Sequence, residues 1–323
     1  MILLTGASGF LGAELLSQLV ERAVLPIRTY GRRISNRFNS NYDNNVCHVI
    51  GEISNEVNYD YVLSGVDVII HCAARVHMMN DKTEDPIAAF KEVNTFGTLN
   101  FARQAATAGV KRFIFVSTIK VNGESTSGCS PFRFNDDCQP QDPYGTSKAD
   151  AEIELKKLAT ETGMEVVIIR PTLVYGPGVK ANFASLMNLV SKGIPLPFGC
   201  ITHNKRSLVS ITNLVDLIIT CIDHPKAANQ VFLVSDDHDV STSEMVREMA
   251  KALGKPAWQL PIPIWCYKLA GKLFNKSDVV DRLTGSLQVD ISHTKETLGW
   301  KPPQTLQEGF KQTAQAFLQA KTK

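Results

Sequence analysis

The feature that most constrains the fold is an alternation of apolar and helical segments over the first 170 residues. Short apolar runs lie at residues 1–5, 25–30, 46–50, 68–71, 113–118 and 166–170. Between them, segments such as 11–21 and 97–108 repeat apolar residues at helical spacing. Runs that are apolar throughout are typical of strands covered on both faces, and their alternation with helices predicts a doubly wound parallel sheet. We therefore expect an α/β fold.

The local composition of the chain changes after Pro171. Glycine and proline become frequent, as in residues 176–178, and a second series of alternating elements follows. This change predicts a first domain over residues 1–170 and a smaller α/β lobe formed mainly by residues 171–323. We expect some segments of the second part to return to the first sheet.

Three glycines directly follow the first predicted strand. Gly6, Gly9 and Gly12 are spaced three residues apart, between a strand that ends at Thr5 and a helix pattern that begins at Leu11. Such glycines permit a tight turn, a close approach of the backbone to a pyrophosphate, and close packing of the helix on the sheet. The context predicts a dinucleotide-binding Rossmann domain, and the alternative is a glycine-rich turn without a ligand. The residues expected to contact the cofactor here are Gly6, Ser8, Gly9, Phe10, Leu11 and Gly12.

The end of the second predicted strand suggests which nicotinamide cofactor binds. An NAD site usually places a carboxylate there for the ribose 2′-hydroxyl, whereas a 2′-phosphate calls for arginine. Residues 26–31 contain no acid, and Arg32 and Arg33 follow. These arginines favour NADP through charge-assisted hydrogen bonds, with NAD as the other possibility. The alternative is that both are solvated surface arginines.

A second motif supplies acid–base chemistry. Tyr144 and Lys148 are four residues apart and share one face of a helix. A nearby ammonium and an oxidised nicotinamide would lower the pKa of the phenol, which could then exchange a proton with a substrate oxygen. The hydroxyl of Thr118 or of Ser117, at the end of the fifth predicted strand, is expected to bind the reacting oxygen. Together these residues predict hydride transfer at a carbinol carbon.

At this point the chain resembles the extended short-chain dehydrogenase/reductase family, in its nucleotide-sugar epimerase/dehydratase group. The likeness rests on residues 5–12, 70–74, 94–98, 116–118, 144–148, 170–178 and 298–302. It implies a catalytic role with the substrate hydroxyl for Thr118, an acid–base role for Tyr144 and a cofactor role for Lys148.

The same resemblance implies further contacts. It places Ala73, Ala74 and Ser117 at the cofactor, beside Tyr144 and Lys148. It places Asn182 and Arg206 at the diphosphate or the sugar of the substrate. For Arg206 a surface position is the alternative.

One departure from the family pattern bears on the reaction. Relatives that eliminate water place Asp and Glu directly after the catalytic Thr, but this chain has Ile119 and Lys120. Neither side chain can serve as that acid or base, so 4,6-dehydration is not expected. Lys120 is either a substrate contact or a solvated lysine at the strand end.

Two enzymatic functions remain possible, and a third hypothesis is a protein that is not an enzyme. The arginines after the second strand favour an NADP-dependent reductase acting at C4 of a UDP-4-keto sugar, similar to bacterial reductases of UDP-4-keto-6-deoxy-N-acetylhexosamines for surface polysaccharide. The alternative is a UDP-hexose 4-epimerase with tightly bound NAD. The third reading is a catalytically silent NADP-binding regulator, although such proteins typically lose the Tyr or the Lys.

Composition limits the other partners. The net charge is +2 with no basic stripe, so no nucleic-acid partner is expected. The seven cysteines contain no Cys-x-x-Cys pair, which predicts neither a metal site nor a disulfide framework. No apolar stretch reaches the length of a membrane span, so we expect a cytoplasmic protein that could still attend membrane-bound chemistry. The resemblance also implies a homodimer formed through the helix of Tyr144 and Lys148.

Overall fold

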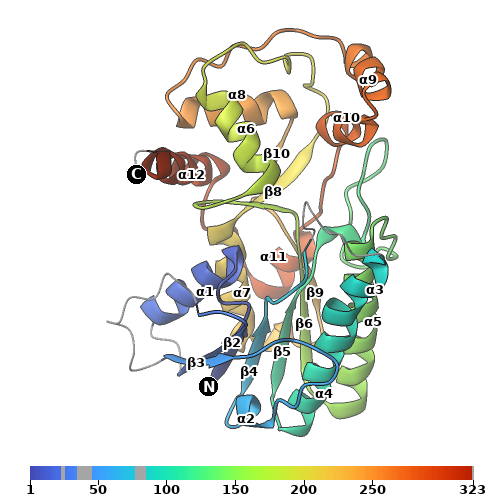
Figure 1. The fold of residues 1–323 in the computed structure, drawn as a ribbon, viewed down its shortest axis with the longest axis vertical. Coiled ribbons are helices and arrows are strands. Elements are labelled where there is room, and N and C mark those ends of the chain that lie inside the picture. Colours follow the sequence, from blue (N-terminus) through green and yellow to red (C-terminus); the bar gives the residue numbers. More distant parts are fainter. Residues whose placement is uncertain (23–25, 35–45, 77–84, 322–323) are drawn as a thin grey trace.

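A parallel sheet of seven strands forms the centre of the larger lobe (Figure 1). The computed structural model describes residues 1–22, 26–34, 46–76 and 85–321. The sheet has the order β3-β2-β1-β4-β5-β6-β9, in which every neighbouring pair is parallel. Its strands are β1 (Ile2–Thr5), β2 (Ile27–Gly31), β3 (Val46–Ile50), β4 (Val68–His71), β5 (Arg112–Val116), β6 (Glu165–Pro171) and β9 (Val231–Val234). The predicted doubly wound sheet is confirmed.

Successive residues of the strands face two different cores. Ile2 and Leu4 of β1 pack into the core that α1 (Phe10–Glu21) and α7 (Ile211–Asp223) cover. Leu3 packs into the core on the other face, which α4 (Thr98–Thr107) and α5 (Pro143–Thr162) cover. This is the alternation expected of a strand that is buried on both sides. The helices flank the sheet on its two faces in Figure 1.

One strand end and one helix start differ from the prediction. The fifth strand was expected to reach Thr118, but β5 ends at Val116, and Thr118 instead precedes the short 3-10 helix η3 (Ile119–Val121). The helix expected over residues 97–108 is α4, and a π-helical turn, η2 (Glu92–Gly97), continues directly into it. The two hydroxyls at 117 and 118 therefore lie on a turn beyond the sheet.

The smaller lobe lies beyond the carboxyl end of the sheet (Figure 1). Its three-stranded sheet has the order β10-β8-β7. The strands are β7 (Leu173–Tyr175), β8 (Arg206–Ser210) and β10 (Asp239–Val240). The later helices are α6 (Ala181–Ser191), α8 (Thr242–Ala252), α9 (Ile264–Leu273), α10 (Ser277–Thr284), α11 (Ser292–Leu298) and α12 (Leu306–Lys321).

The chain does not remain in one lobe after residue 171. After β8 it enters α7, which packs beside α1, and then β9, which pairs with β6 at the edge of the large sheet. The predicted return of later segments to the first sheet is thus observed, while the domain boundary at residue 170 stays a prediction. The remaining short helices are α2 (Asp60–Leu63), α3 (Pro86–Lys91) and η4 (Pro225–Ala227). Among the described residues, no helix combines the length and the apolar character needed to cross a bilayer.

Candidate active site

The glycine turn between β1 and α1 is tightly folded. Gly6 has a φ of 74°, which favours glycine, and a Cβ there would lie 2.7 Å from the backbone nitrogen of Ala73. A Cβ on Gly12 would lie 2.2 Å from the carbonyl oxygen of Gly6. The predicted tight turn and close helix packing are therefore present in the structure.

The start of α1 fits a pyrophosphate. Gly9 is the N-cap residue and has no side chain to accept a hydrogen bond from the first turn. Ser8 and Gly9 are exposed, and Phe10 and Leu11 are half-buried. The first amides of a helix seek an acceptor, and the helix dipole favours an anion there. These residues fit the predicted role, which stays a prediction.

The ends of β1 and β4 are held side by side above the turn. Thr5 Oγ1 lies 2.9 Å from Nδ1 of His71 and accepts a 3.2 Å hydrogen bond from the backbone nitrogen of Ala73. Burial lowers the pKa of His71 to about 3, so this ring is neutral and structural. Ala73 and Ala74 are half-buried beside Gly6, as a contact with a dinucleotide in the turn would require.

Arg32 and Arg33 lie directly after β2, and both are exposed. The carbonyl of Tyr30 accepts a 3.4 Å hydrogen bond from the amide of Gly6, so the end of β2 adjoins the glycine turn. The arginines therefore follow the strand end where the ribose 2′ position of a dinucleotide is usually held. Their contact with a phosphate stays a prediction.

Tyr144 and Lys148 lie in the first two turns of α5. Asp142 caps this helix, since its Oδ1 accepts a 2.6 Å hydrogen bond from the amide of Gly145. Lys148 is buried, its Nζ donates a 2.9 Å hydrogen bond to the carbonyl of Val116, and the same nitrogen lies 4.2 Å from the ring centroid of Phe115. Burial lowers the pKa of Lys148 to about 8. The helix thus points the ammonium at the end of β5.

In the protein without a cofactor, Lys148 does not lower the pKa of Tyr144, so this expectation is wrong. Burial first, and the negative charge of Asp142 second, raise the pKa of Tyr144 to about 12. The lysine ammonium is directed at the Val116 carbonyl instead of the phenol. The phenol of the protein is therefore protonated near neutral pH, which suits a proton donor.

The two hydroxyls after β5 have different surroundings. Ser117 is buried, and its Oγ donates a 2.5 Å hydrogen bond to Glu152. Its hydroxyl proton is therefore already used within the protein, and its predicted contacts with the reacting oxygen or the cofactor stay predictions. Thr118 is half-buried, and its Oγ1 accepts only a long 3.3 Å bond from the amide of Lys120. Of the two, Thr118 is the better candidate for a substrate contact.

A buried ion pair behind these residues was not predicted. Glu152 and Arg170 are each only 1% exposed, and Arg170 Nε lies 3.0 and 3.1 Å from the two carboxylate oxygens. Arg170 Nη1 also donates a 2.9 Å hydrogen bond to Oδ1 of Asn122. The pair joins α5 and β6 to the turn that carries Thr118. Its signal in the sequence was an acid four residues after Lys148, on the same helix face.

Lys120 does not have the second of its two predicted roles, that of a solvated lysine, and its contact with the substrate stays a prediction. Its Nζ forms ion pairs with Asp142 and, at 3.0 Å, with Glu124, and the side chain is about one-third exposed. It is not a freely solvated lysine, and its charge is already matched within the protein. Asp142 is also the N-cap residue of the helix that carries Tyr144, so Lys120 contacts the residue that caps this helix.

Asn182 and Arg206 lie in the smaller lobe. Asn182 is exposed in the first turn of α6. Arg206 begins β8 and donates hydrogen bonds to the carbonyls of Arg282 (2.9 Å) and Gly285 (3.3 Å). Burial, and then the charge of Arg282, lower the pKa of Arg206. Arg206 is therefore not a solvated surface residue, and the neighbouring Arg282 is a second cation that the sequence pattern did not reveal.

The π-helical turn η2 links the segment after β4 to α5, the helix that carries Tyr144. Asn94 is fully buried, and its Nδ2 donates hydrogen bonds of 3.0 Å to both Ser147 Oγ and the carbonyl of Arg75. Thr95 Oγ1 donates a 2.8 Å bond to the carbonyl of Ser147. π turns of this kind are often found at functional sites. Here the turn fixes α5 against the segment that follows β4.

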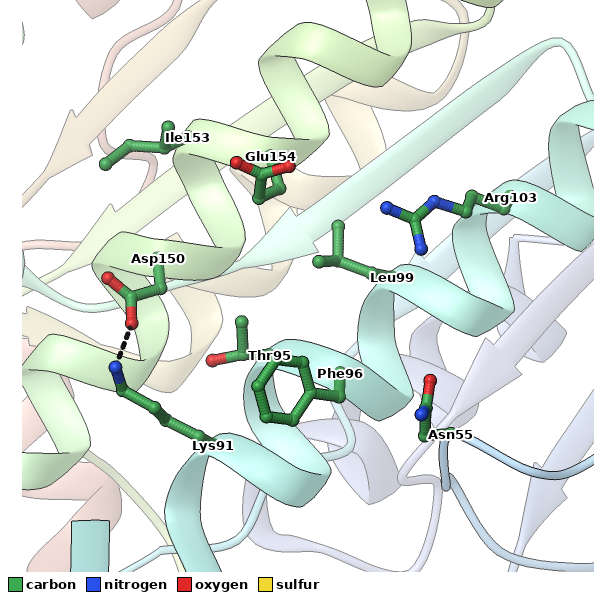
Figure 2. Close-up of a pocket in the computed structure, with 9 residues that line it drawn as sticks. All are labelled: Asn55, Lys91, Thr95, Phe96, Leu99, Arg103, Asp150, Ile153 and Glu154. Atoms are coloured by element: carbon green, nitrogen blue, oxygen red, sulfur yellow. Dashed lines mark ion pairs between the residues drawn. The ribbon is translucent and has the colours of Figure 1, made fainter. Parts of the chain in front are cut away.

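A groove of about 560 Å³ lies elsewhere, on the outer face of the helices that flank the sheet. Figure 2 shows its lining, with side chains from the π turn and α4 facing others from α5. The lining residues are Asn55, Lys91, Thr95, Phe96, Leu99, Arg103, Asp150, Ile153 and Glu154. None of these is a predicted site residue, so the groove and the predicted site are separate.

Known proteins resemble this chain over nearly its whole length. It is 65% identical over 319 residues to a UDP-glucose 4-epimerase of Vibrio cholerae, covering 99% of this chain and 96% of that protein. It is 28% identical over 338 residues, 99% of this chain and 96% of that protein, to the N-acetyl-alpha-D-glucosaminyl-diphospho-ditrans,octacis-undecaprenol 4-epimerase of Escherichia coli O157:H7.

Solved structures share the fold. The UDP-glucose 4-epimerase of Thermotoga maritima with UDP-glucose has a TM-score of 0.75 at 22% identity, and the UDP-glucuronic acid 4-epimerase of Bacillus cereus with NAD has 0.78 at 18% identity. Each comparison covers 99% of both chains. A sequence profile described as the NAD dependent epimerase/dehydratase family matches residues 2–235. With the glycine turn, the Tyr144–Lys148 pair and these relatives in agreement, the chain belongs to the NAD dependent epimerase/dehydratase family of extended short-chain dehydrogenases/reductases.

Proposed function

We propose that this protein is a UDP-hexose 4-epimerase that retains NAD. The observation that carries the proposal is the 65% identity, over 99% of the chain, to a protein named UDP-glucose 4-epimerase. This likeness favours the epimerase over the UDP-4-keto-sugar reductase that the arginines after β2 had favoured. The presence of both Tyr144 and Lys148 speaks against a catalytically silent regulator.

Different residues of the chain have different roles in the reaction at C4 of the sugar. Bound NAD would supply the acceptor and donor of the hydride. Tyr144 would take the proton from the C4 hydroxyl as a phenolate and later return it to the C4 oxygen, and the positive charge of an oxidised nicotinamide beside it would lower its pKa for this step. Thr118 Oγ1 donates a hydrogen bond that orients this oxygen. Lys148, fixed between the Val116 carbonyl and the Phe115 ring, would hydrogen-bond the nicotinamide ribose, which is the cofactor role predicted for it.

The glycine turn would hold the pyrophosphate of the cofactor. Support comes from the uncapped first turn of α1 and from the backbone contact of Gly6 with Ala73. NAD is proposed because fold neighbours such as the Bacillus cereus enzyme contain it. The preference for NADP, based on Arg32 and Arg33, stays a prediction.

The smaller lobe would hold the nucleotide part of the substrate. Arg206 and Arg282 lie close enough to influence each other's charge, and neither forms an ion pair within the described residues. Two neighbouring cations without a carboxylate suit a diphosphate, which needs fixed positive charge. Asn182 stays a predicted contact at the start of α6. We propose UDP as the nucleotide because the Vibrio cholerae relative is named for it.

We also propose that two copies associate through the groove of Figure 2. Its apolar side chains Phe96 and Ile153 are 48% and 47% exposed, and Lys91 and Asp150 form a 2.8 Å ion pair at its edge. An exposed apolar patch with a polar rim is typical of an interface between subunits. The homodimer implied by the resemblance would bury this patch.

The reductase remains the second candidate function because β2 ends without an acid and is followed by Arg32 and Arg33. An experiment separates the two. The purified protein is incubated with UDP-glucose or UDP-N-acetylglucosamine without added cofactor, and separately with a UDP-4-keto-6-deoxy sugar and NADPH. Appearance of the C4 epimer, with NAD released on denaturation, supports the epimerase. Stoichiometric oxidation of NADPH, without epimer formation, would overturn it in favour of the reductase.

A further inference from the structure

The tip of the smaller lobe exposes an unusual number of large apolar side chains. Of the seventeen large apolar residues that are exposed in the described part of the chain, seven lie between residues 258 and 279. They are Trp258, Leu260, Trp265, Leu269, Leu273, Phe274 and Val279. Single exposed apolar residues are ordinary, but their concentration in one short segment is typical of a surface that binds a partner or a membrane. In Figure 1, α9 lies near the end of the molecule that is opposite the large sheet, with α10 beside it.

The apolar residues form a stripe along α9. Trp265, Leu269 and Leu273 are spaced four residues apart, which places them along one side of the helix, and their exposed fractions are 66%, 61% and 76%. The other side of α9 is packed. Gly271 is buried there, so close to Val280 of α10 that an added Cβ would lie 2.8 Å from its Cγ2. The stripe is therefore the free side of a helix whose opposite side is already packed.

Lysines border this stripe. Lys268 and Lys272 are exposed on α9, and Lys276 is exposed just beyond it. The sequence from 249 to 277 contains no Asp or Glu. This local excess of positive charge stands out in a chain whose net charge is only +2. The nearest acids, Asp278 and Asp281, are exposed on α10. On α9 itself, tryptophan and leucine lie beside lysines without acids, a pattern typical of helices in the interface of an anionic bilayer, where lysine stems cover apolar surface and the ammonium reaches the headgroups.

We propose that the α9 face, defined by Trp265, Leu269, Leu273, Lys268 and Lys272, binds the surface of an anionic lipid bilayer. A bilayer suits this face better than a second protein, because lysine is depleted at protein interfaces and enriched on membrane-surface helices. The helix would lie in the plane of the membrane, with the large sheet directed away from it. The inference is independent of the proposed function, since it concerns another surface.

Vesicle binding tests the proposal. Full-length protein is floated with vesicles of phosphatidylglycerol and phosphatidylcholine, and with vesicles of phosphatidylcholine alone. We expect binding to the anionic vesicles that weakens with salt, because the lysine contribution is screened. Trp265→Ser/Leu269→Ser should weaken it by on the order of tenfold or more, since an apolar anchor is lost. The matched control Ile50→Ser/Ile87→Ser removes equally exposed apolar residues elsewhere and should bind like the parent.

The lysines are tested in the same way. Lys268→Gln/Lys272→Gln should weaken binding to anionic vesicles, by about tenfold or less for each lysine removed. Lys156→Gln/Lys311→Gln, which alters two exposed lysines on α5 and α12, should not. All of these variants should keep the parent's activity on a free UDP-sugar. A failure of the proposed function would leave the vesicle results unaffected.

The three tryptophans give a direct readout of position. Trp258 and Trp265 are exposed, whereas Trp300 is buried. Lipids brominated near the headgroup should quench part of the tryptophan fluorescence in the parent. In Trp258→Phe/Trp265→Phe, where only Trp300 remains, they should quench none of it. No binding to anionic vesicles, equal quenching of both proteins, or a concentration-dependent dimer that Trp265→Ser/Leu269→Ser abolishes without any vesicle binding would each overturn the proposal.

Discussion

One carboxylate connects Lys120 to the chemistry of Tyr144. Asp142 accepts a hydrogen bond from Gly145 at the start of α5 and forms an ion pair with Lys120. Its negative charge is the second cause, after burial, of the raised pKa of Tyr144. Lys120 partly neutralises this charge, while the ring of Phe90 lies 6.1 Å from that of the phenol. We therefore predict that Lys120 is a positioning residue that acts on the phenol through Asp142.

The pH profile of activity tests this arrangement. Lys120→Met leaves the charge of Asp142 unmatched, so the pKa of Tyr144 should rise and the limb of the kcat/KM profile that reports the phenol should move to higher pH. Asp142→Asn keeps an oxygen acceptor for the cap but removes the charge, so the limb should move to lower pH. Glu124→Gln is the control, because it leaves the Lys120–Asp142 pair in place. Coincident profiles for Lys120→Met, Asp142→Asn and the parent would refute the role.

Removal of the phenol hydroxyl is the second test at this scale. Tyr144→Phe should lower kcat by about 10²- to 10⁴-fold, the usual contribution of a general acid or base. The ring contact with Phe90 remains, so the midpoint of thermal unfolding should stay close to that of the parent. A fully active Tyr144→Phe enzyme would show that another group moves the proton.

At the scale of elements, the buried Glu152–Arg170 pair holds α5, β6 and the turn after β5 together. Glu152→Gln would leave a buried guanidinium without its counter-charge, and we expect a loss of about 3–5 kcal/mol in the free energy of unfolding. Urea denaturation measures it. The control is Asp237→Asn, which breaks an exposed ion pair with Lys295 outside the groove and should cost about 0.5 kcal/mol or less. Equal effects of the two substitutions would mean that burial of the pair does not matter.

A second pair of contacts links the amino ends of β1, β4 and β5. Asp67 Oδ1 lies 2.8 Å from Lys111 Nζ, and its Oδ2 lies 2.6 Å from the terminal amine of Met1. Lys111 first, and then the amine, lower the pKa of Asp67 to about 2 from the ordinary 3.8. A lowered pKa in the folded state stabilises the fold above pH 4, and this contribution is lost as the pH falls towards 2. Asp67→Asn should therefore flatten the fall in unfolding temperature over that range, and an unchanged slope would contradict the assignment.

Local patterns were sufficient for the first six strands of the large sheet, apart from the end of β5, and for the glycine turn and the helix of Tyr144. These depend on neighbours in the sequence: apolar runs, glycine spacing and a four-residue helical repeat. The orientation of Ser117 was not predictable in this way, because it depends on Glu152 and Arg170, which lie 35 and 53 residues later. The partnership of Arg206 with Arg282 likewise joins two distant segments of the smaller lobe. Long-range pairs of this kind leave no periodic trace in one sequence.

At the scale of the whole molecule, the groove between α4 and α5 is the proposed interface of a homodimer. Ile153→Asp would place a charge inside the proposed dimer interface, where an unpaired carboxylate is costly to bury. We expect the variant to be monomeric by light scattering at concentrations at which the parent is a dimer. Ile50→Asp, at an exposed position on β3, is the control and should not change the mass. A monomeric parent, or a dimeric Ile153→Asp, would exclude this surface as the interface.

The position of β9 has a consequence for how such a protein can evolve. The strand reaches the edge of the large sheet only after the chain has built β7, α6 and β8 in the other lobe, and residues 168–171 of β6 pair with residues 231–234. A gene fragment that stopped at residue 170 would encode a sheet with a bare, apolar margin and would lack the helix that covers α1. Neither lobe is then a module that recombination could shuffle alone, so the two would be inherited as one unit.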